Sequence, residues 1–397
     1  MKILLINTFY NIGSTGKIVH DIEKYIKKKT NHTVECLYSW GSIGNSKDNC
    51  YASKIDKILT KVLVYLFGYR YGFSYFSTYK LIKKIKKIKP DIINLHCSNA
   101  FDVNLYYFIK YCNRKKLNLL ITEHAEYYYT ANCSYAYDCN KWMDGCNNCK
   151  IYKQVTKARF FDTTKKSWEL MYNAFNKYEN KPIIICVSDW LKDRSLKGKI
   201  TNSCKHFTIK NGINTNIFNN NYYDKKLTQD NYILHITPDF SLARKGGHYL
   251  IELARKNKDK QFYVIGKYDK TKKYPNNIKF LGLIRNQKEL AKYYNNAKLT
   301  ILLSERETFS MIVPESLCCG TPIIGFLAGA PETITIKKYS EFVEYGNIDN
   351  INEKLNLWYN KVYNKDKISK DAMKIYSSEK MGENYLNLFY ESLNIKK

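Results

Sequence analysis

Strand-like apolar runs alternate with helix-like stretches along nearly the whole chain, and this alternation is the strongest constraint on its fold. Helical patterns such as Gly16–Lys28, Asn104–Arg114 and Lys165–Asn173 separate the runs of the first half. Strands that alternate with helices are typical of parallel sheets with helical crossovers. The sequence therefore predicts an α/β protein, and the strand-like runs of its first half are Lys2–Ile6, Thr33–Tyr38, Asp91–His96, Leu117–Thr122, Ile183–Ser188 and His206–Ile209.

The alternation stops at a polar stretch, 219–231 (NNNYYDKKLTQDN), and then begins again. A chain of 397 residues is long enough to bury two separate cores. We therefore expect two doubly wound domains over 1–218 and 232–375, with 219–231 as the linker and a helical tail over 376–397. The strand-like runs of the second half are Tyr232–Thr237, Gln261–Ile265, Ile278–Leu281, Leu299–Leu303 and Pro322–Phe326.

Two carboxylates eight positions apart, Glu307 and Glu315, follow the run Leu299–Leu303. Glu307 is expected in a loop and Glu315 inside a short helix with Ser310 near its cap. The free N–H groups at such a helix start suit a phosphate, and flanking carboxylates suit the hydroxyl groups of a ribose or a sugar. By chemistry alone this is a candidate nucleotide-sugar site. The structural alternative is two solvated glutamates at a helix end.

The same segment resembles the Glu-x7-Glu motif of retaining glycosyltransferases of family 4, because Cys319-Gly320-Thr321-Pro322 follows it in the register of that family. The resemblance implies that Glu307 contacts the donor sugar and Glu315 binds the nucleotide ribose. It also implies donor binding by the intervening Phe309, Ser310, Met311 and Ile312. The family usually has Gly where Ser310 stands, which leaves a role for the backbone amide intact.

Members of this family have the GT-B fold, in which two Rossmann-like domains face a cleft. The resemblance therefore implies that the helix over 376–397 crosses back to the first domain. Further landmarks follow in the expected order, and they are especially similar to colanic-acid-type and capsular polysaccharide transferases. These landmarks are Gly13–Ile18 after Ile6-Asn7, Pro90–His96, Val187–Trp190 and Asn211–Ile213.

Phosphate binding is expected at Arg244 and Lys245, which follow a strand-like run and precede Gly246-Gly247 at the start of a helix. Cations and glycine amides at this position suit a diphosphate. The pair is similar to the donor motif of the family, in which the lysine neutralises charge on the leaving group. An exposed Arg-Lys pair without a ligand is the structural alternative. In the first half, Gly13, Ser14, Thr15 and Gly16 are expected to form a tight loop that lets a ligand approach the backbone.

His124 lies just past a predicted strand, and Thr122, His124, Thr130 and Cys133 follow the family register. The resemblance implies that His124 is catalytic and touches the donor sugar. Ala125 replaces the usual Asp, so any role of that Asp is absent or passes to Glu123 or Glu126.

Four cysteines with the spacing C-x5-C-x6-C-x2-C lie in an insert near 131–150, and they are Cys133, Cys139, Cys146 and Cys149. Four thiolates can hold a structural zinc, but reduced thiols or one or two disulfides fit the same spacing. Catalysis is expected to need no metal, because the chain has no DxD motif and retaining transfer is thought to use the leaving phosphate as the proton acceptor.

The chain is strongly basic, with 65 Lys+Arg against 36 Asp+Glu, or a net charge of +29. The lysines are spread out, so codon bias is one explanation and contact with an anionic membrane another, whereas nucleic acid fits less well. Lys80–Lys89 places Leu81, Ile82, Ile85 and Ile88 at helical spacing, which predicts a core-facing helix with a solvated lysine face. The aromatic stretch Ile55–Phe76 is expected to form a core-packing helical hairpin, or else an edge that meets a membrane-embedded acceptor.

No secretory signal is expected, because MKILLIN runs into a polar glycine-rich segment, and no apolar run is long enough to span a bilayer. Twelve cysteines without such a signal favour the reducing cytoplasm. The sequence thus predicts a cytoplasmic enzyme, in one interpretation at the inner face of the membrane. It would move a sugar from a UDP- or GDP-sugar to a lipid-linked glycan in surface polysaccharide biosynthesis. The alternatives are a nucleotide-sugar 2-epimerase of the same fold and a basic, zinc-clipped RNA-binding protein.

Overall fold

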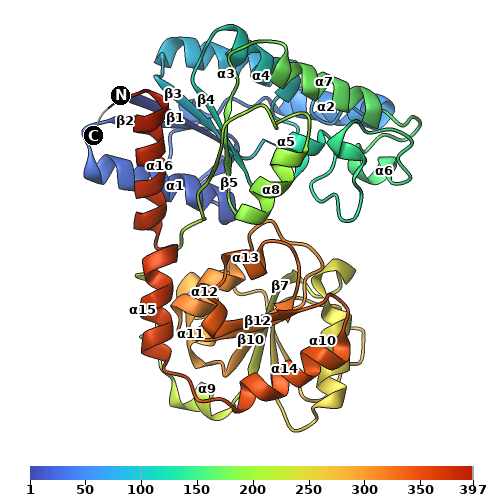
Figure 1. The fold of residues 1–397 in the computed structure, drawn as a ribbon, viewed down its shortest axis with the longest axis vertical. Coiled ribbons are helices and arrows are strands. Elements are labelled where there is room, and N and C mark those ends of the chain that lie inside the picture. The colour runs from blue at the N-terminus through green and yellow to red at the C-terminus, as the bar shows by residue number, and fades with distance from the viewer. Residues whose placement is uncertain (99, 396–397) are drawn as a thin grey trace. The chain divides into compact units, whose positions relative to one another are not determined.

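The computed structural model describes residues 1–98 and 100–395, which form two compact units (Figure 1). Unit 1 comprises Met1–Lys210 together with Met381–Lys397, and unit 2 comprises Asn211–Lys380. Each unit is built around a six-stranded sheet, and neighbouring strands pair in parallel throughout both sheets. The predicted α/β class is confirmed.

The sheet of unit 1 has the strand order β2-β1-β3-β4-β5-β6. Every strand-like run of the first half forms one of these strands, although β1 continues four residues beyond the predicted Ile6. The strands are β1 (Lys2–Tyr10), β2 (Thr33–Ser42), β3 (Ile92–Leu95), β4 (Leu119–Glu123), β5 (Ile183–Cys186) and β6 (His206–Thr208).

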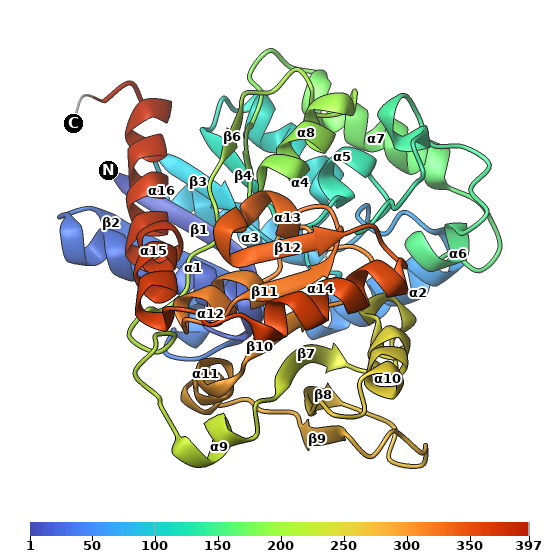
Figure 2. The same ribbon diagram turned by 60° about the horizontal axis from the view of Figure 1, so that its bottom comes forward.

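The core of unit 1 joins α1 and α16 to one face of this sheet (Figures 1 and 2). Met381, Tyr385 and Phe389 of α16 are buried against strands of the first half. The helices of unit 1 are α1 (Gly13–Lys29), α2 (Lys54–Phe67), α3 (Tyr75–Ile88), α4 (Leu105–Arg114), α5 (Tyr127–Thr130), α6 (Tyr152–Val155), α7 (Thr164–Asn176), α8 (Asp189–Lys197) and α16 (Ser378–Ser392).

The sheet of unit 2 has the order β12-β11-β10-β7-β8-β9, which is the strand order of a Rossmann fold. Its last strand, Ser340–Val343, was not predicted, because Ser340 and Glu341 break the apolar run that marks the other strands. The strands are β7 (Ile233–Asp239), β8 (Phe262–Lys267), β9 (Ile278–Gly282), β10 (Leu299–Leu302), β11 (Ile323–Phe326) and β12 (Ser340–Val343).

The core of unit 2 forms where α10 and α14 pack on this sheet, with Leu250, Leu253, Ile351 and Leu355 all fully buried. The helices of unit 2 are α9 (Lys225–Gln229), α10 (Gly247–Lys256), α11 (Gln287–Asn296), α12 (Ile312–Cys318), α13 (Pro331–Ile334), α14 (Ile348–Asn360) and α15 (Lys365–Tyr376).

The polar stretch 219–231 lies in unit 2 and contains α9. Two amides at the end of α11 hold it: Asn295 donates to the Asn219 carbonyl at 2.9 Å and Asn296 to the Tyr222 carbonyl at 2.7 Å. The polar residues of this stretch therefore make specific hydrogen bonds within the unit.

Helices α2 and α3 differ in which face they bury. The predicted amphipathic helix Lys80–Lys89 is confirmed within α3, because Leu81, Ile82, Ile85 and Ile88 are buried. The prediction that Ile55–Phe76 packs into the core was wrong for α2, whose apolar side chains are mostly exposed. Among the described residues, none of the helices combines the length and the apolar character needed to cross a bilayer.

Candidate active site

The loops after β7 and β10 meet at the topological switch point of unit 2. These two strands are neighbours in the sheet, yet β7 continues to β8 on one side and β10 to β11 on the other. Open α/β sheets bind ligands at such a point, beyond the carboxyl ends of the strands. The loop after β7 carries Arg244 and Lys245, and the loop after β10 carries Glu307. The fold therefore brings together two predicted site segments that lie far apart in the sequence.

An ion pair joins the two loops. The ammonium Nζ of Lys245 lies 2.5 Å from Oε1 of Glu307, and both side chains are only 12% exposed. The backbone amide of Glu305 also donates to the carbonyl of Arg244 at 2.9 Å. Because water screens this ion pair little, its charges interact strongly with nearby groups. An incoming diphosphate would compete with the Glu307 carboxylate for the Lys245 ammonium.

The loop after β11 holds the backbone of Glu307 by hydrogen bonds. Its amide donates to the carbonyl of Ala328 at 2.9 Å, and its carbonyl accepts from the amide of Ala330 at 3.1 Å. These two hydrogen bonds hold the residue in a short parallel bridge with Gly329. The carboxylate of Glu307 is therefore aimed by backbone contacts on both sides.

Ser310 lies near the cap of the helix, as expected, because it directly precedes the N-cap residue Met311. Helix α12 begins at Ile312, and Ser310 adopts a left-handed backbone with φ of 72°. This conformation costs an ordinary residue about 1–2 kcal/mol and favours glycine. The backbone at this position of the motif therefore favours glycine over serine. Phe309 is buried, and Met311 and Ile312 are half-buried.

Glu315 lies in the first turn of α12, and its Oε2 accepts a hydrogen bond from the hydroxyl of Tyr294 at 2.9 Å. Tyr294 is fully buried at the end of α11. Sequence reasoning missed this tyrosine, because nothing in the local pattern links α11 to α12. Its hydroxyl orients the carboxylate that was predicted to bind a ribose.

An open cavity of about 430 Å³ lies beside the loop after β7. Phe240, Leu242, Gly247, His248, Lys272 and Tyr274 are among the residues that line it. Its volume is within the usual range for small-molecule sites. The cavity offers an aromatic ring and a cation next to the segment that carries Lys245.

In unit 1 the switch point lies between β1 and β3. The predicted loop Gly13–Gly16 is instead the first turn of α1, and β1 runs to Tyr10. Gly16 is buried there, where a Cβ atom would lie 3.0 Å from the carbonyl oxygen of Phe9. Ser14 is exposed in this turn and Thr15 is half-buried. The backbone that a ligand could approach is therefore the start of a helix.

A chain of hydrogen bonds runs from β3 to His124. Nε2 of His96 lies 2.8 Å from Oδ1 of Asn94, and Nδ1 of His96 lies 3.1 Å from Nε2 of His124. Burial lowers the pKa of His124 to about 4 and holds that of His96 well below its usual range. Both imidazoles are therefore neutral near pH 7. If Asn94 accepts from His96, then the neutral His124 donates from Nε2 to Nδ1 of His96.

His96 was recognised in the sequence only as a landmark, not as a site residue. Both histidines follow parallel neighbouring strands, β3 and β4, so their meeting follows from the sheet order. Glu123 and Glu126, the two candidate replacements for the missing Asp, bind other side chains. Glu123 accepts from Ser195 at 3.2 Å, and Glu126 pairs with Arg194 at 2.9 Å.

The four cysteines of the insert lie near one another. Burial is the main cause that raises the pKa of Cys133, Cys146 and Cys149, and the nearby Cys139 raises each of them further. All four are free thiols. Within residues 1–98 and 100–395, no three His, Cys, Asp or Glu side chains form a group that could hold a metal ion. The structural zinc stays a prediction, which metal analysis of the purified chain would test.

The fold and this site define an α/β protein of the GT-B class. Residues 225–375 match the family described as glycosyl transferases group 1. The chain therefore carries a group 1 glycosyltransferase domain within a two-domain GT-B fold, and the resemblance stated from the motifs is confirmed.

Similar proteins span nearly the whole of this chain. An uncharacterized 42.6 kDa protein in the cps region of Klebsiella pneumoniae is 23% identical over 95% of this chain and 100% of its own length. The solved sucrose-phosphate synthase of Thermosynechococcus elongatus superposes with a TM-score of 0.68 at 13% identity over 99% of both chains. Anabaena HepE in complex with UDP-glucose gives 0.63 at 12% identity, also over 99% of both.

Proposed function

We propose that this chain transfers a sugar, with retention of anomeric configuration, from a nucleoside-diphosphate sugar to a lipid-linked glycan. The single observation that carries the proposal is the Lys245–Glu307 pair at the switch point of the group 1 domain. The pair sets a cation that can hold a diphosphate directly against a carboxylate that can bind a sugar hydroxyl. Both are needed in a donor site, where a charged leaving group adjoins a polar ring.

The proposed donor site assigns one task to each group. Lys245 and Arg244 neutralise the diphosphate, and the backbone between Phe309 and Ile312 faces the same group. Glu307 then releases Lys245 and accepts a hydrogen bond from a hydroxyl of the sugar. Glu315, oriented by Tyr294, accepts from the hydroxyls of the ribose. UDP is the first nucleotide to test, since HepE, a protein of similar fold, binds UDP-glucose.

In the transfer step the oxygen of the acceptor hydroxyl forms a bond to the anomeric carbon. The bond from that carbon to the phosphate oxygen breaks on the same face of the ring. The proton of the hydroxyl passes to an oxygen of the departing nucleoside diphosphate. Lys245 stabilises the negative charge that develops on that phosphate. Because cationic side chains carry this charge, we expect the rate to be unchanged when divalent cations are removed with EDTA.

His124 and the first turn of α1 are the proposed contributions of unit 1. The neutral His124 is proposed to contact a hydroxyl of the donor sugar, with His96 and Asn94 fixing its ring. The amides of Gly13, Ser14 and Thr15 lie at the start of a 17-residue helix and can face an anionic group. These residues are proposed as positioning groups around the donor and acceptor.

The acceptor is proposed to be a lipid-linked glycan of a surface polysaccharide, used in the cytoplasm at the inner face of the membrane. The similarity to a protein from a cps region supports this assignment. A lipid-linked acceptor would be presented at a membrane surface, and the strongly basic chain suits an anionic one.

Nucleotide binding tests the proposed donor site. We expect isothermal titration to detect UDP or GDP, together with its sugars, and we expect Glu315→Ala to weaken that binding about tenfold or more. An exposed glutamate of the same unit, Glu353→Ala, is the matched control and should bind as the wild type does. Salt-sensitive RNA binding without any nucleotide-sugar binding would instead support the RNA-binding alternative.

A further inference from the structure

Helix α2 presents its apolar side chains to solvent. Ile55 is 77% exposed, Ile58 66% and Val62 50%. Leu59, Tyr65, Leu66 and Phe67 are exposed as well. A surface helix of a globular protein normally turns its apolar stripe toward the core. Helix α2 does the opposite.

The buried stripe of α2 is largely polar and is held by specific contacts. Asp56 and Thr60 are almost fully buried, one turn apart. Oδ2 of Asp56 accepts from the amide of Ser77 at 2.8 Å, and Oγ1 of Thr60 lies 3.2 Å from Oγ of Ser74. Turning the helix to bury its isoleucines would break these bonds, and a buried polar group without a partner costs about 1–3 kcal/mol. The exposed apolar face is therefore the stable arrangement.

Neighbouring segments add aromatic rings to the exposed set. The first turns of α3 expose Tyr75, Phe76 and Tyr79. Beside the end of α2, Phe160 and Phe161 are exposed, and the ring of Phe160 lies 6.5 Å from that of Tyr65. The amide of Arg159 donates to the carbonyl of Tyr65 at 2.8 Å, which fixes this loop on the helix. We call α2, the first turns of α3 and residues 159–161 the α2–α3 surface.

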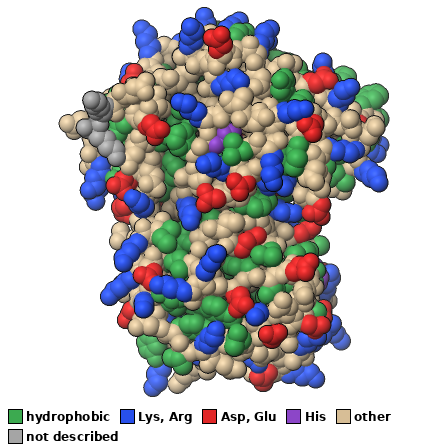
Figure 3. Space-filling model, viewed as in Figure 1, with side chains coloured by type: hydrophobic (Ala, Val, Ile, Leu, Met, Phe, Trp, Pro, Cys, Tyr) green, Lys and Arg blue, Asp and Glu red, His purple; other side chains and the backbone are tan. Residues whose placement is uncertain are grey.

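The charge on the two helices has one sign. The acidic residue in the sequences of α2 and α3 is Asp56, which is buried, so their exposed charges are all lysines. The exposed lysines are Lys54, Lys61, Lys80, Lys83, Lys86 and Lys87, and Lys57 and Lys84 are half-buried. On the face drawn in Figure 3, lysine and arginine side chains are interspersed with acidic ones. Exposed apolar and aromatic side chains interspersed with lysines are the composition of helices that lie in a membrane interface.

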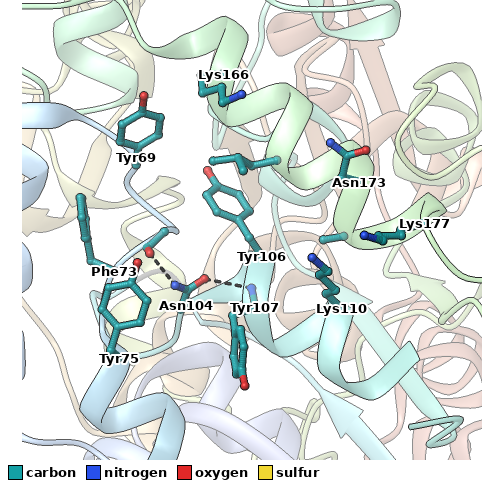
Figure 4. A pocket seen from close by; sticks show the side chains of 13 residues that line it. Tyr69, Phe73, Tyr75, Asn104, Tyr106, Tyr107, Lys110, Lys166, Asn173 and Lys177 are labelled. Atoms are coloured by element: carbon teal, nitrogen blue, oxygen red, sulfur yellow. Dashed lines mark hydrogen bonds between the residues drawn. The ribbon is translucent and has the colours of Figure 1, made fainter. Parts of the chain in front are cut away.

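An open pocket of about 570 Å³ adjoins this surface at Tyr75. Figure 4 shows rings at one end, including Phe73, Tyr75 and Tyr107, and the lysines Lys110 and Lys177 at the other. Its lining includes no Asp or Glu. The pocket therefore continues the pattern of aromatic rings and cations away from α2 and α3.

We propose that the α2–α3 surface docks on an anionic lipid bilayer. The exposed isoleucine, leucine, valine and aromatic side chains enter the interface, and the lysines contact lipid phosphates. A second copy of the chain fits less well, because two faces that carry lysines without acids would repel each other. The inference deepens the proposed function, since it supplies the partner that carries a lipid-linked acceptor. Its test measures lipid binding without any sugar transfer, so either proposal can fail alone.

Flotation of the full chain with vesicles tests the surface. One set contains phosphatidylcholine alone, and the other contains phosphatidylcholine and phosphatidylglycerol at about three to one. We expect binding to the anionic vesicles, weakened by added salt, and at least about tenfold weaker binding to the neutral ones. The triple variant Ile55→Ser, Ile58→Ser, Val62→Ser should bind anionic vesicles about tenfold or more weakly. Its matched control replaces exposed apolar residues of unit 2, Leu283→Ser, Leu357→Ser and Val362→Ser, and should bind like the wild type.

A second variant probes the charges. Lys54→Glu, Lys61→Glu and Lys83→Glu together should weaken anionic binding about a hundredfold, because each lysine at such a surface contributes about 1 kcal/mol. Lys258→Glu, Lys270→Glu and Lys273→Glu change the net charge equally and should retain most of the binding. All six substituted lysines are exposed. The two glutamate variants therefore test whether the α2–α3 surface binds anionic lipid even if the serine variant fails to fold.

Three results would overturn the proposal. One is a wild-type chain that does not float with anionic vesicles. Another is unchanged binding by folded variants of the α2–α3 surface. The third is a dimer, seen by light scattering, that the serine variant dissociates, because this would identify a second copy as the occupant.

Discussion

A methyl group added at Gly246 should separate the two halves of the proposed donor site. Gly246 connects the turn that carries Lys245 to α10, and it has a left-handed backbone with φ of 76°. A Cβ atom there would lie 2.1 Å from the carbonyl oxygen of Leu303 and 2.5 Å from its Cβ. Leu303 follows β10 and leads to Glu307. Gly246→Ala therefore pushes the Lys245 turn away from the segment that holds Glu307.

The magnitude has two parts, and a second glycine separates them. The left-handed backbone costs alanine about 1–2 kcal/mol relative to glycine. Contact with a backbone oxygen cannot be relieved by a side-chain rotation, and overpacking of this kind adds about 1–3 kcal/mol. Gly282 has nearly the same φ, 74°, but a Cβ there meets nothing within 4 Å. Gly282→Ala should therefore cost about 1–2 kcal/mol, and Gly246→Ala about 2–5 kcal/mol.

Urea unfolding of both variants measures the stability difference, and titration with the nucleotide that binds the wild type measures the site. We expect Gly282→Ala to bind that nucleotide normally and Gly246→Ala to bind it about tenfold or more weakly, because Lys245 moves. Equal losses of stability in the two variants would refute the packing argument. Normal nucleotide binding by Gly246→Ala would refute the link between this turn and the donor site.

Three further substitutions test separate parts of the account. Ser310→Gly should raise the unfolding free energy by about 1 kcal/mol, since it relieves the left-handed backbone; a lower urea midpoint would contradict this. Tyr294→Phe removes the hydrogen bond to Glu315 and should weaken nucleotide binding about fivefold with the fold intact, as titration and circular dichroism would show. Burial raises the pKa of Glu123 to about 8, so the folded chain holds a proton that the unfolded chain releases above about pH 4.3. The unfolding free energy should therefore fall as the pH rises from about 5 to about 8, and Glu123→Gln should reduce that fall; equal pH profiles would contradict this.

The sequence predicted the strands well because each is a short apolar run bounded by polar residues. It missed Ser340–Val343, the edge strand of unit 2, where two polar residues precede only two apolar ones. The segments with site chemistry were also visible locally, as a cationic turn and a carboxylate loop. Their contact was not, because Lys245 and Glu307 are 62 residues apart and only the order of β7 and β10 makes them neighbours.

The burial of α2 could not be predicted from its pattern. Its apolar residues have helical spacing, which favours a core-facing stripe. What decides the outcome is a set of partners on the neighbouring segment, Ser74 and Ser77, which hold Asp56 and Thr60 inward. A pattern on one helix does not contain that information. The left-handed backbone at Ser310 could not be predicted for the same reason, because contacts of the surrounding loops override the local preference of a serine.

The most direct test of the central claim is the release of nucleoside diphosphate from a nucleotide sugar, measured with and without a lipid-linked glycan acceptor. We predict release that depends on the acceptor and yields an extended glycan. Glu307→Ala should abolish most of the turnover with nucleotide binding largely retained, whereas Glu315→Ala should mainly raise the donor concentration required. Release of a free sugar epimer without any acceptor would contradict the proposed transfer and support the epimerase alternative. Normal turnover by both variants would contradict the assigned site.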